Sequence, residues 1–303
     1  MAEQLDHGEW KGNTAGSTWM HRTLIASFRI MNLRFVYLGM AVFVVPMYML
    51  FAHQGYITMY HYFRQRQGYG VLKSFLHVYL NHYRFGQVIL DRFASYAGQK
   101  FEFELDGMDL FERLSAGKEG FMILSSHIGN YELAGYSFSS MHKRYNALVY
   151  SGEAETVMEN RNRMLSKHNI RMIAMKEDMS HVFMVNEALA NGEIVSAPSD
   201  RVFGSPRNLT CDFMGGKGRF PLGPFMMALQ RGLPTITIFV MKISPYRYKV
   251  YIREVKCDER PYANRQEKAQ NLAQHFAAEM EKVVRLYPDQ WFNYFEFWNN
   301  DKE

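Results

Sequence analysis

The pair with the clearest chemical potential is His127 and Glu132, an imidazole and a carboxylate with four residues between them. They directly follow the apolar run 121–125, which predicts a strand, a tight turn and a helix capped by Asn130. His127 then lies at the carboxyl end of a strand, where open α/β sheets bind ligands. Glu132 in the first helical turn can accept the imidazole N–H and fix its tautomer. The pair is therefore a candidate general base with its orienting acid, the alternative being an ordinary structural histidine near a helix start.

The elements that must position this pair alternate along the chain. Hydrophobic periodicity predicts strands at 101–105, 121–125, 145–150, 170–174, 193–197, 235–241 and 248–255. It predicts helices at 71–97, 110–116, 130–142, 153–168, 179–191, 225–231 and 265–286. This order indicates an α/β fold with a mostly parallel or mixed sheet flanked by helices. The aromatic segment 287–298 is expected to cover a core edge or an acyl-binding groove, the former being favoured.

The amino-terminal part has a different composition. Residues 35–52 carry no charge, and as a helix they would extend ~27 Å, close to the ~30 Å hydrocarbon core of a bilayer. Their hydrophobicity is continuous, which favours a membrane anchor over a buried core helix, and Pro46 would kink the helix. Residues 1–19 do not resemble a cleavable signal. We therefore expect a polar amino terminus and anchor over residues 1–66, in a monotopic arrangement on the cytoplasmic leaflet, and a catalytic domain over residues 67–303.

Charge and composition restrict the partners. The net charge of +5 and the sequence pI of about 9.0 favour anionic partners such as lipid head groups or an acidic carrier protein. The sequence contains no basic run, finger spacing or ribonucleoprotein motif that would support nucleic acid as a partner. Its two cysteines are too few for a disulfide framework and fit a reducing compartment.

Four sequence blocks then occur in a distinctive order. They are the His-x4-Glu pair, the segment 192–201 ending in Asp200 and Arg201, the Phe-Pro-x-Gly turn at 220–223, and the apolar strand introduced by Pro234. Together they resemble the motif blocks of the lysophospholipid acyltransferase superfamily over roughly residues 20–298. The hydrophobic anchor, the Gly-Asn within the first block and the terminal Pro-x-Gln-Trp are most similar to the bacterial late acyltransferases of lipid A biosynthesis.

The resemblance implies transfer of an acyl chain from a thioester to a hydroxyl of a membrane lipid at the bacterial inner membrane, with the catalytic domain on its cytoplasmic side. Acyl carrier protein is the expected donor in this branch, ahead of coenzyme A, and neither a cofactor nor a metal is implied. His127 and Glu132 would be catalytic, and no Gly-x-Ser-x-Gly elbow suggests a covalent serine route. The candidate substrate-binding residues are Asn130, Asp200, Arg201, Arg219 and Gly223.

Two positions depart from the family patterns. Arg201 follows Asp200 where the lipid A branch more often has Gln or His, and Leu222 stands where glycerolipid enzymes usually have Glu. A lysophospholipid or an acylated amino-acid lipid is therefore an alternative acceptor, and a catalytically silent lipid-binding protein is an alternative of another class. Asp200 and Arg201 could instead form a buried ion pair at the sheet edge. Lys217 and Arg219, in a glycine-rich loop, could bind the acceptor or the carrier, or simply be solvated.

Overall fold

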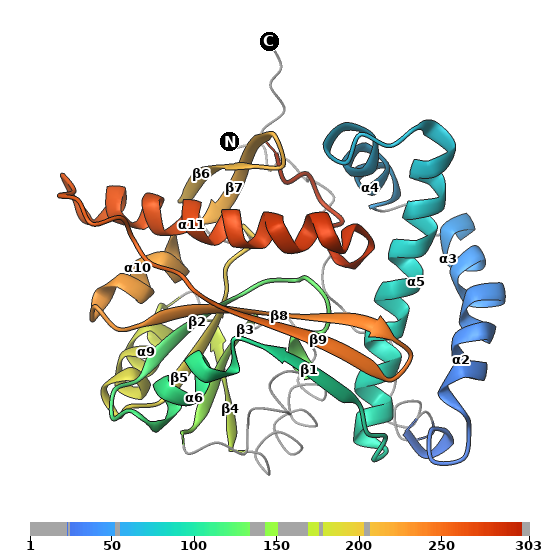
Figure 1. Ribbon diagram of the computed structural model, residues 1–303, viewed down its shortest axis with the longest axis horizontal. Helices are drawn as coiled ribbons and strands as arrows, with labels where there is room; N and C mark the ends of the chain where they lie inside the picture. The colour runs from blue at the N-terminus through green and yellow to red at the C-terminus, as the bar shows by residue number, and fades with distance from the viewer. Residues whose placement is uncertain are drawn as a thin grey trace.

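A seven-stranded sheet forms the centre of the molecule (Figure 1). The computed structural model describes residues 23, 25–51, 55–133, 143–150, 169–175, 178–202 and 207–298. The strands are β1 (Glu102–Asp106), β2 (Phe121–Ser125), β3 (Tyr145–Tyr150), β4 (Ile170–Met175), β5 (Ile194–Pro198), β8 (Thr235–Ser244) and β9 (Arg247–Glu254), in the order β1-β9-β8-β2-β5-β3-β4. Strands β8 and β9 are antiparallel and all other neighbours are parallel. The predicted α/β class with a mostly parallel, mixed sheet is confirmed.

The two faces of the sheet are buried by different helices. Because successive side chains of a strand point to opposite faces, Phe121 and Ile123 of β2 pack with α6 (Met108–Ala116). Met122 and Leu124 of the same strand face the larger core, which includes α9 (Ser180–Ala190), α10 (Leu222–Gln230) and α11 (Arg265–Leu286). The continuous apolar run of β2 is thus explained by burial on both faces.

Most predicted helices occur at or near the expected positions. Helix α5 spans Val71–Tyr96, and α11 has the predicted bounds. Helix α10 begins three residues before the prediction, because Pro221 precedes it and Pro224 is tolerated in its first turn, where no intrahelical N–H bond is lost. The helix expected at 130–142 is helical at 131–133, and its remaining residues, like those of the expected helix 153–168, lie outside the described residues.

The glycine-rich segment around residues 213–220 is part of a hairpin, which corrects the prediction of a loop. Strand β6 (Asn208–Phe213) pairs antiparallel with β7 (Gly216–Pro221). Met214 and Gly215 both have positive φ, as a two-residue hairpin turn of this twist requires. Alternate residues of β6 are buried, a period of two that the neighbouring glycines obscured in the sequence.

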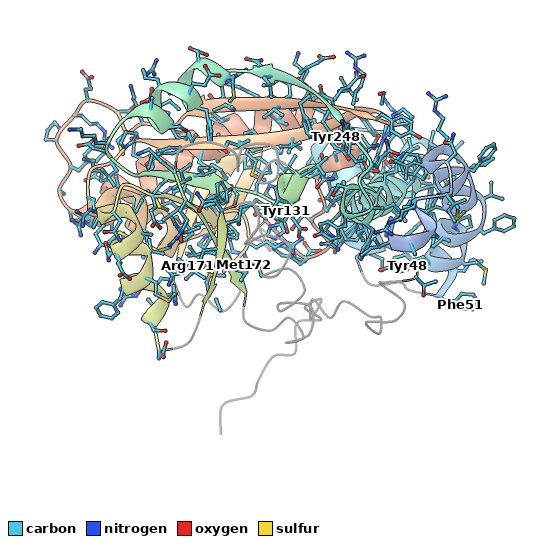
Figure 2. All side chains as sticks on the ribbon, turned by 90° about the horizontal axis from the view of Figure 1, so that it is seen from below. Tyr48, Phe51, Tyr131, Arg171, Met172 and Tyr248 are labelled. Carbon is cyan, nitrogen blue, oxygen red and sulfur yellow. The ribbon has the colours of Figure 1, made fainter. Side chains whose placement is uncertain are left out.

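The uncharged amino-terminal segment is helical and lies on α5. Its described residues lie in α2 (Leu33–Gly39), the π-helical turn η1 (Met40–Val44) and α3 (Val45–Phe51), with Pro46 as the second residue of α3. Leu33–Phe51 is long and apolar enough to cross a membrane, and only 22% of its most apolar window is buried. Figure 1 shows α2 and α3 on the side of α5 away from the sheet, and Figure 2 shows Tyr48 and Phe51 in this part of the molecule.

The segment after this apolar helix packs into the main core. It forms α4 (Tyr56–His61) and the π-helical turn η2 (Tyr62–Arg66). Met59, Tyr62 and Phe63 are buried together with residues of the sheet and of α11. Core contacts therefore cross residue 66, the boundary predicted between the anchor segment and the catalytic domain.

Removing a core ring from α11 should destabilise the fold. Phe276 is 0% exposed among aromatic neighbours, so Phe276→Ala should lower the free energy of unfolding by about 3–5 kcal/mol. Phe183, 78% exposed on α9, is the matched control, and Phe183→Ala should change stability by less than ~0.5 kcal/mol. Equilibrium denaturation measures both, and equal losses would contradict this assignment of the core.

Candidate active site

The candidate site lies where two neighbouring parallel strands end. In the register of β2 and β5, Ser125 is opposite Pro198, and the chain continues two residues from each to His127 and Asp200. The Ser199 N–H donates to the Ser125 carbonyl at 2.8 Å, which keeps the two loops together beyond the strands. The equal offset brings the two side chains to the same sheet edge.

Asp200 holds His127 through both of its carboxylate oxygens. The main-chain N–H of His127 donates to Oδ2 at 2.7 Å, and Nδ1 of the ring is 2.8 Å from Oδ1. An ionised carboxylate only accepts hydrogen bonds, so the proton is on Nδ1 and Nε2 is left as the basic nitrogen. The Asp200 side chain is 1% exposed, whereas that of His127 is 22% exposed. The imidazole is thus oriented from within the protein while part of it reaches the surface.

Burial favours the neutral imidazole of His127, and the neighbouring groups favour the ionised carboxylate of Asp200. Burial lowers the pKa of His127 below its usual 6.5, and Arg201 lowers it further, against the opposing effects of Asp200 and Glu132. Burial alone would raise the pKa of Asp200, but His127 and Arg201 outweigh it and the pKa is lowered. A neutral imidazole beside an ionised carboxylate is the state that a general base requires.

Glu132 is placed differently from the prediction. Its carboxylate accepts from the Arg92 guanidinium of α5 at 3.0 and 3.1 Å, while the contact with the His127 ring nitrogen belongs to Asp200. The physical reason is that Glu132 lies in the first turn of the helix after the loop, opposite Arg92 of α5, whereas Asp200 reaches the same sheet edge as His127 from the adjacent strand. Glu132 still acts on His127 through its charge, which favours the protonated imidazole.

The loop from His127 to Asn130 is held between β8 and the carboxyl-terminal segment. The Gly129 N–H donates to the Gln290 carbonyl and the Asn130 N–H to the Val240 carbonyl, both at 2.8 Å. Gly129 has φ +60°, and a Cβ there would lie 2.1 Å from the Val240 oxygen. Only glycine therefore fits this position, because both the conformation and the close approach exclude a side chain.

Asn130 caps the helix as predicted. Its Oδ1 accepts from the Leu133 N–H at 3.3 Å, and its Nδ2 donates to the Tyr248 hydroxyl at 3.2 Å. The residue is buried, and both ends of its amide are engaged by protein groups. The contact of Asn130 with substrate stays a prediction.

The two arginines predicted to bind substrate both contact the carboxyl-terminal segment. Arg201 donates to the Phe292 carbonyl at 2.8 Å, and Arg219 donates to the Glu296 carbonyl at 2.9 Å. Arg201 is also among the charged groups that influence His127, which places it at the site. Gly223 lies exposed in the first turn of α10, with open space around its Cα.

Sequence reasoning missed the groups that support the loop from behind. The Phe292 N–H donates to the His127 carbonyl at 3.1 Å, and Asn81 of α5 donates to the carbonyls of Asp289 and Trp291. Trp291 is buried against Tyr62 and Phe213. The predicted covering role of segment 287–298 is therefore confirmed. The segment also packs against one side of the loop that carries His127. In the sequence, only its aromatic content indicated that it would be buried.

Comparison with known proteins gives one family. The family model described as bacterial lipid A biosynthesis acyltransferase matches residues 92–299, well over half of the sequence, and the match includes His127 and Asp200. No curated protein matches the sequence.

The acid limit of activity should follow His127. Only the neutral imidazole can accept a proton, so kcat/KM should fall as the pH decreases through the pKa of His127, below 6.5. Arg201→Gln removes a cation that lowers this pKa and should therefore move the acid limb to higher pH. Arg219→Gln, which loses the same kind of main-chain contact without bordering His127, is the control. An unchanged limb in Arg201→Gln would contradict the electrostatic assignment.

Proposed function

The chain belongs to the bacterial lipid A biosynthesis acyltransferase family, and from this premise we propose that it transfers a fatty acyl chain to a hydroxyl of lipid A or of a precursor of lipid A. The observation that carries the proposal is the His127–Asp200 contact, within the region that the family model matches. We further propose that His127 is the general base. Acyl carrier protein is the proposed donor, favoured over coenzyme A, and no other cofactor is required.

The proposed reaction needs one proton acceptor and one orienting charge. Nε2 of His127 removes the proton from the lipid hydroxyl while the oxygen attacks the thioester carbonyl carbon. Collapse of the tetrahedral intermediate breaks the carbon–sulfur bond, and the imidazolium returns the proton to the leaving thiolate. The product is an ester and a free thiol, and the histidine ends the cycle neutral.

The charges near His127 support this sequence of events. The imidazolium that forms after proton removal would lie against the Asp200 carboxylate, which is already ionised and bonded to Nδ1. The negative charge of Glu132, balanced by Arg92, favours the same protonated state. Burial and, after it, Arg201 oppose protonation and so favour the neutral histidine before the reaction. Together these groups support a base that is neutral at rest and stabilised when it takes the proton.

Catalysis and the choice of partner carboxylate are tested by three variants. His127→Ala should leave only a small residual rate of acyl transfer in purified membranes, and Asp200→Asn should reduce kcat by about 10²–10⁴ because the base loses its orienting charge. Glu132→Gln should cost less, since its carboxylate bonds to Arg92. Full activity of His127→Ala would exclude the general base. If Glu132→Gln were as inactive as His127→Ala and Asp200→Asn were active, Glu132 would be the orienting acid after all.

The identity of the acceptor is tested in the cell. Lipid mass spectrometry of a strain without this gene should show lipid A lacking one acyl chain, and the chain should return with the wild-type gene but not with His127→Ala. Loss of an acyl chain from a lysophospholipid-derived or amino-acid lipid, with lipid A unchanged, would replace the proposed acceptor.

The amino-terminal helices support an acceptor that is reached from a membrane surface. Large apolar side chains of α3, α4 and the start of α5 are exposed, among them Leu50, Phe51, Ile57, Leu72 and Phe75. Residues 10–90 contain eight Lys and Arg and no Asp or Glu, whereas the rest of the chain has 27 basic and 30 acidic residues. An apolar segment whose charged residues are all basic suits an anionic lipid leaflet. We propose that it docks on the cytoplasmic face of the inner membrane.

Charge placed on this surface should weaken docking. Leu72→Glu combined with Phe51→Glu should lower affinity for vesicles of phosphatidylethanolamine and phosphatidylglycerol by at least about tenfold. Two apolar side chains that would insert into the bilayer are replaced by charged ones. Leu286→Glu, at an exposed leucine on α11, is the control and should bind like the wild type. Co-sedimentation measures both. Wild-type affinity in the double variant would place the membrane contact elsewhere.

A further inference from the structure

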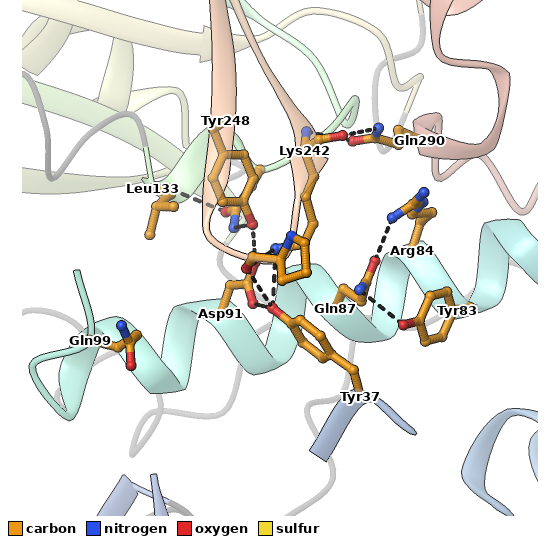
Figure 3. A network of polar contacts seen from close by, with 12 residues as sticks. Tyr37, Tyr83, Arg84, Gln87, Asp91, Gln99, Leu133, Lys242, Tyr248 and Gln290 are labelled. Carbon is orange, nitrogen blue, oxygen red and sulfur yellow. Dashed lines mark hydrogen bonds and ion pairs between the residues drawn. The ribbon is translucent and has the colours of Figure 1, made fainter. Parts of the chain in front are cut away.

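A buried ion pair lies beside the active-site loop and is not used by the proposed chemistry (Figure 3). Asp91 of α5 and Lys242 of β8 are 2.5 Å apart, and both side chains are almost completely inaccessible. The hydroxyls of Tyr37 and Tyr248 both donate to the Asp91 carboxylate. Lys242 Nζ also donates to the Tyr37 hydroxyl at 3.1 Å and to the Pro245 carbonyl at 2.9 Å. We name Tyr37, Asp91, Lys242 and Tyr248 the Asp91 cluster.

Such a cluster is an inefficient way to gain stability. Burial raises the pKa of Asp91 and lowers the pKa of Lys242, and their ion pair opposes both shifts. Desolvation can cancel the attraction between two buried charges, so apolar residues of similar size often serve stability as well or better. Charged and hydroxyl groups instead fix the relative orientation of the side chains, because each hydrogen bond constrains the angle and distance of its partner.

One arm of the cluster reaches the active-site loop. The Tyr248 hydroxyl, which donates to Asp91, accepts from Asn130 Nδ2 at 3.2 Å, and Asn130 Oδ1 caps the helix that starts after the loop. The main chain around Lys242 reaches the same loop. Gln290 exchanges two 2.8 Å hydrogen bonds with the Lys242 backbone, and its own carbonyl accepts the Gly129 N–H.

The other arm reaches the amino-terminal helices. Tyr37 lies in α2, within the uncharged helical segment that packs on the outer side of α5. Its hydroxyl crosses that interface to Asp91, so a single carboxylate bonds one tyrosine from the apolar segment and one from β9. A chain of hydrogen bonds thus connects the amino-terminal helices to the loop of His127. It runs from Tyr37 to Asp91, from Asp91 to Tyr248, and from Tyr248 to Asn130.

We propose that Tyr248 and Asn130, oriented by Asp91, are positioning residues for His127, and that the seating of α2 through Tyr37 completes their orientation. The proposal rests on the proposed role of His127 as the base. A loop displaced by a fraction of an ångström would leave Nε2 misaligned with the acceptor hydroxyl, while the binding of either substrate would be unaffected. The expected signature is therefore a lower kcat at unchanged KM.

The first test compares two tyrosines at the same helix interface. Tyr37→Phe removes the hydroxyl that reaches Asp91, and Tyr79→Phe removes one that donates to the Ala41 carbonyl at 2.8 Å. Each variant keeps its ring and loses one hydrogen bond between the amino-terminal segment and α5. We expect kcat to fall about tenfold or more in Tyr37→Phe, with KM for both substrates unchanged, and to remain near the wild-type value in Tyr79→Phe. Equal kcat values for the two variants would overturn the role of Tyr37.

The second test is a double-mutant cycle nearer to the loop. Tyr248→Phe breaks the contacts with Asp91 and Asn130, and Asn130→Ser keeps a helix-capping hydroxyl that is too short to reach Tyr248. Each should lower kcat by about 10–100-fold, and the double variant should be no worse than the more impaired single variant, because both act through the same contact. Additive losses would show independent effects and overturn the proposal.

The background of His127→Ala separates this inference from the proposed function. Tyr248→Phe should lower kcat in the wild type but leave the residual rate of His127→Ala unchanged, since a positioning residue has nothing left to position. A further loss in that background would mean that Tyr248 acts independently of His127 and would overturn the inference. Full activity of His127→Ala itself would instead refute the general-base proposal.

Discussion

The pair of hydrogen bonds between Asp200 and His127 is the interaction on which the site depends. One carboxylate accepts hydrogen bonds from both the main-chain N–H and the ring Nδ1 of the same residue. It therefore fixes the backbone, the rotamer and the tautomer of His127 together. This is possible only because β2 and β5 are adjacent, parallel and in a register that places the two residues at equal distances beyond the strands. The charge has also to be buried, and the neighbouring imidazole and guanidinium offset that cost.

The rest of the molecule supports this contact from two sides. The carboxyl-terminal segment accepts the Gly129 N–H and donates to the His127 carbonyl, so a chain end more than 150 residues away forms one wall of the loop. Helix α5 holds that segment through Asn81 and presents Asp91 to the other side. The hydrogen bonds of the loop are therefore supplied by neighbours that are themselves packed, which is how precise geometry is maintained at an active site.

The distribution of charge separates the part proposed to meet the membrane from the part proposed to carry the chemistry. The described residues of the stretch 10–90 combine exposed apolar side chains with basic ones, and Asp91 is the first acidic residue after that stretch. Its carboxylate is buried and neutralised by Lys242, so it adds no negative charge to the surface. The family match begins at residue 92, immediately after it. Asp91 thus lies between the amino-terminal segment and the region that the family model matches, and its carboxylate contacts residues of both.

The sequence by itself determined the α/β class, most elements and the candidate base, because hydrophobic periodicity and the position of His127 after an apolar strand are local properties. It also indicated the cap by Asn130 and the burial of the aromatic carboxyl terminus. Only the tertiary structure decided which carboxylate meets the imidazole. Spacing along the chain favoured Glu132, but a hydrogen bond depends on strand order and register, and these bring Asp200 across from the adjacent strand while Glu132 turns to Arg92. The Asp91 cluster was equally invisible, since its four members come from four elements whose meeting is a result of packing alone.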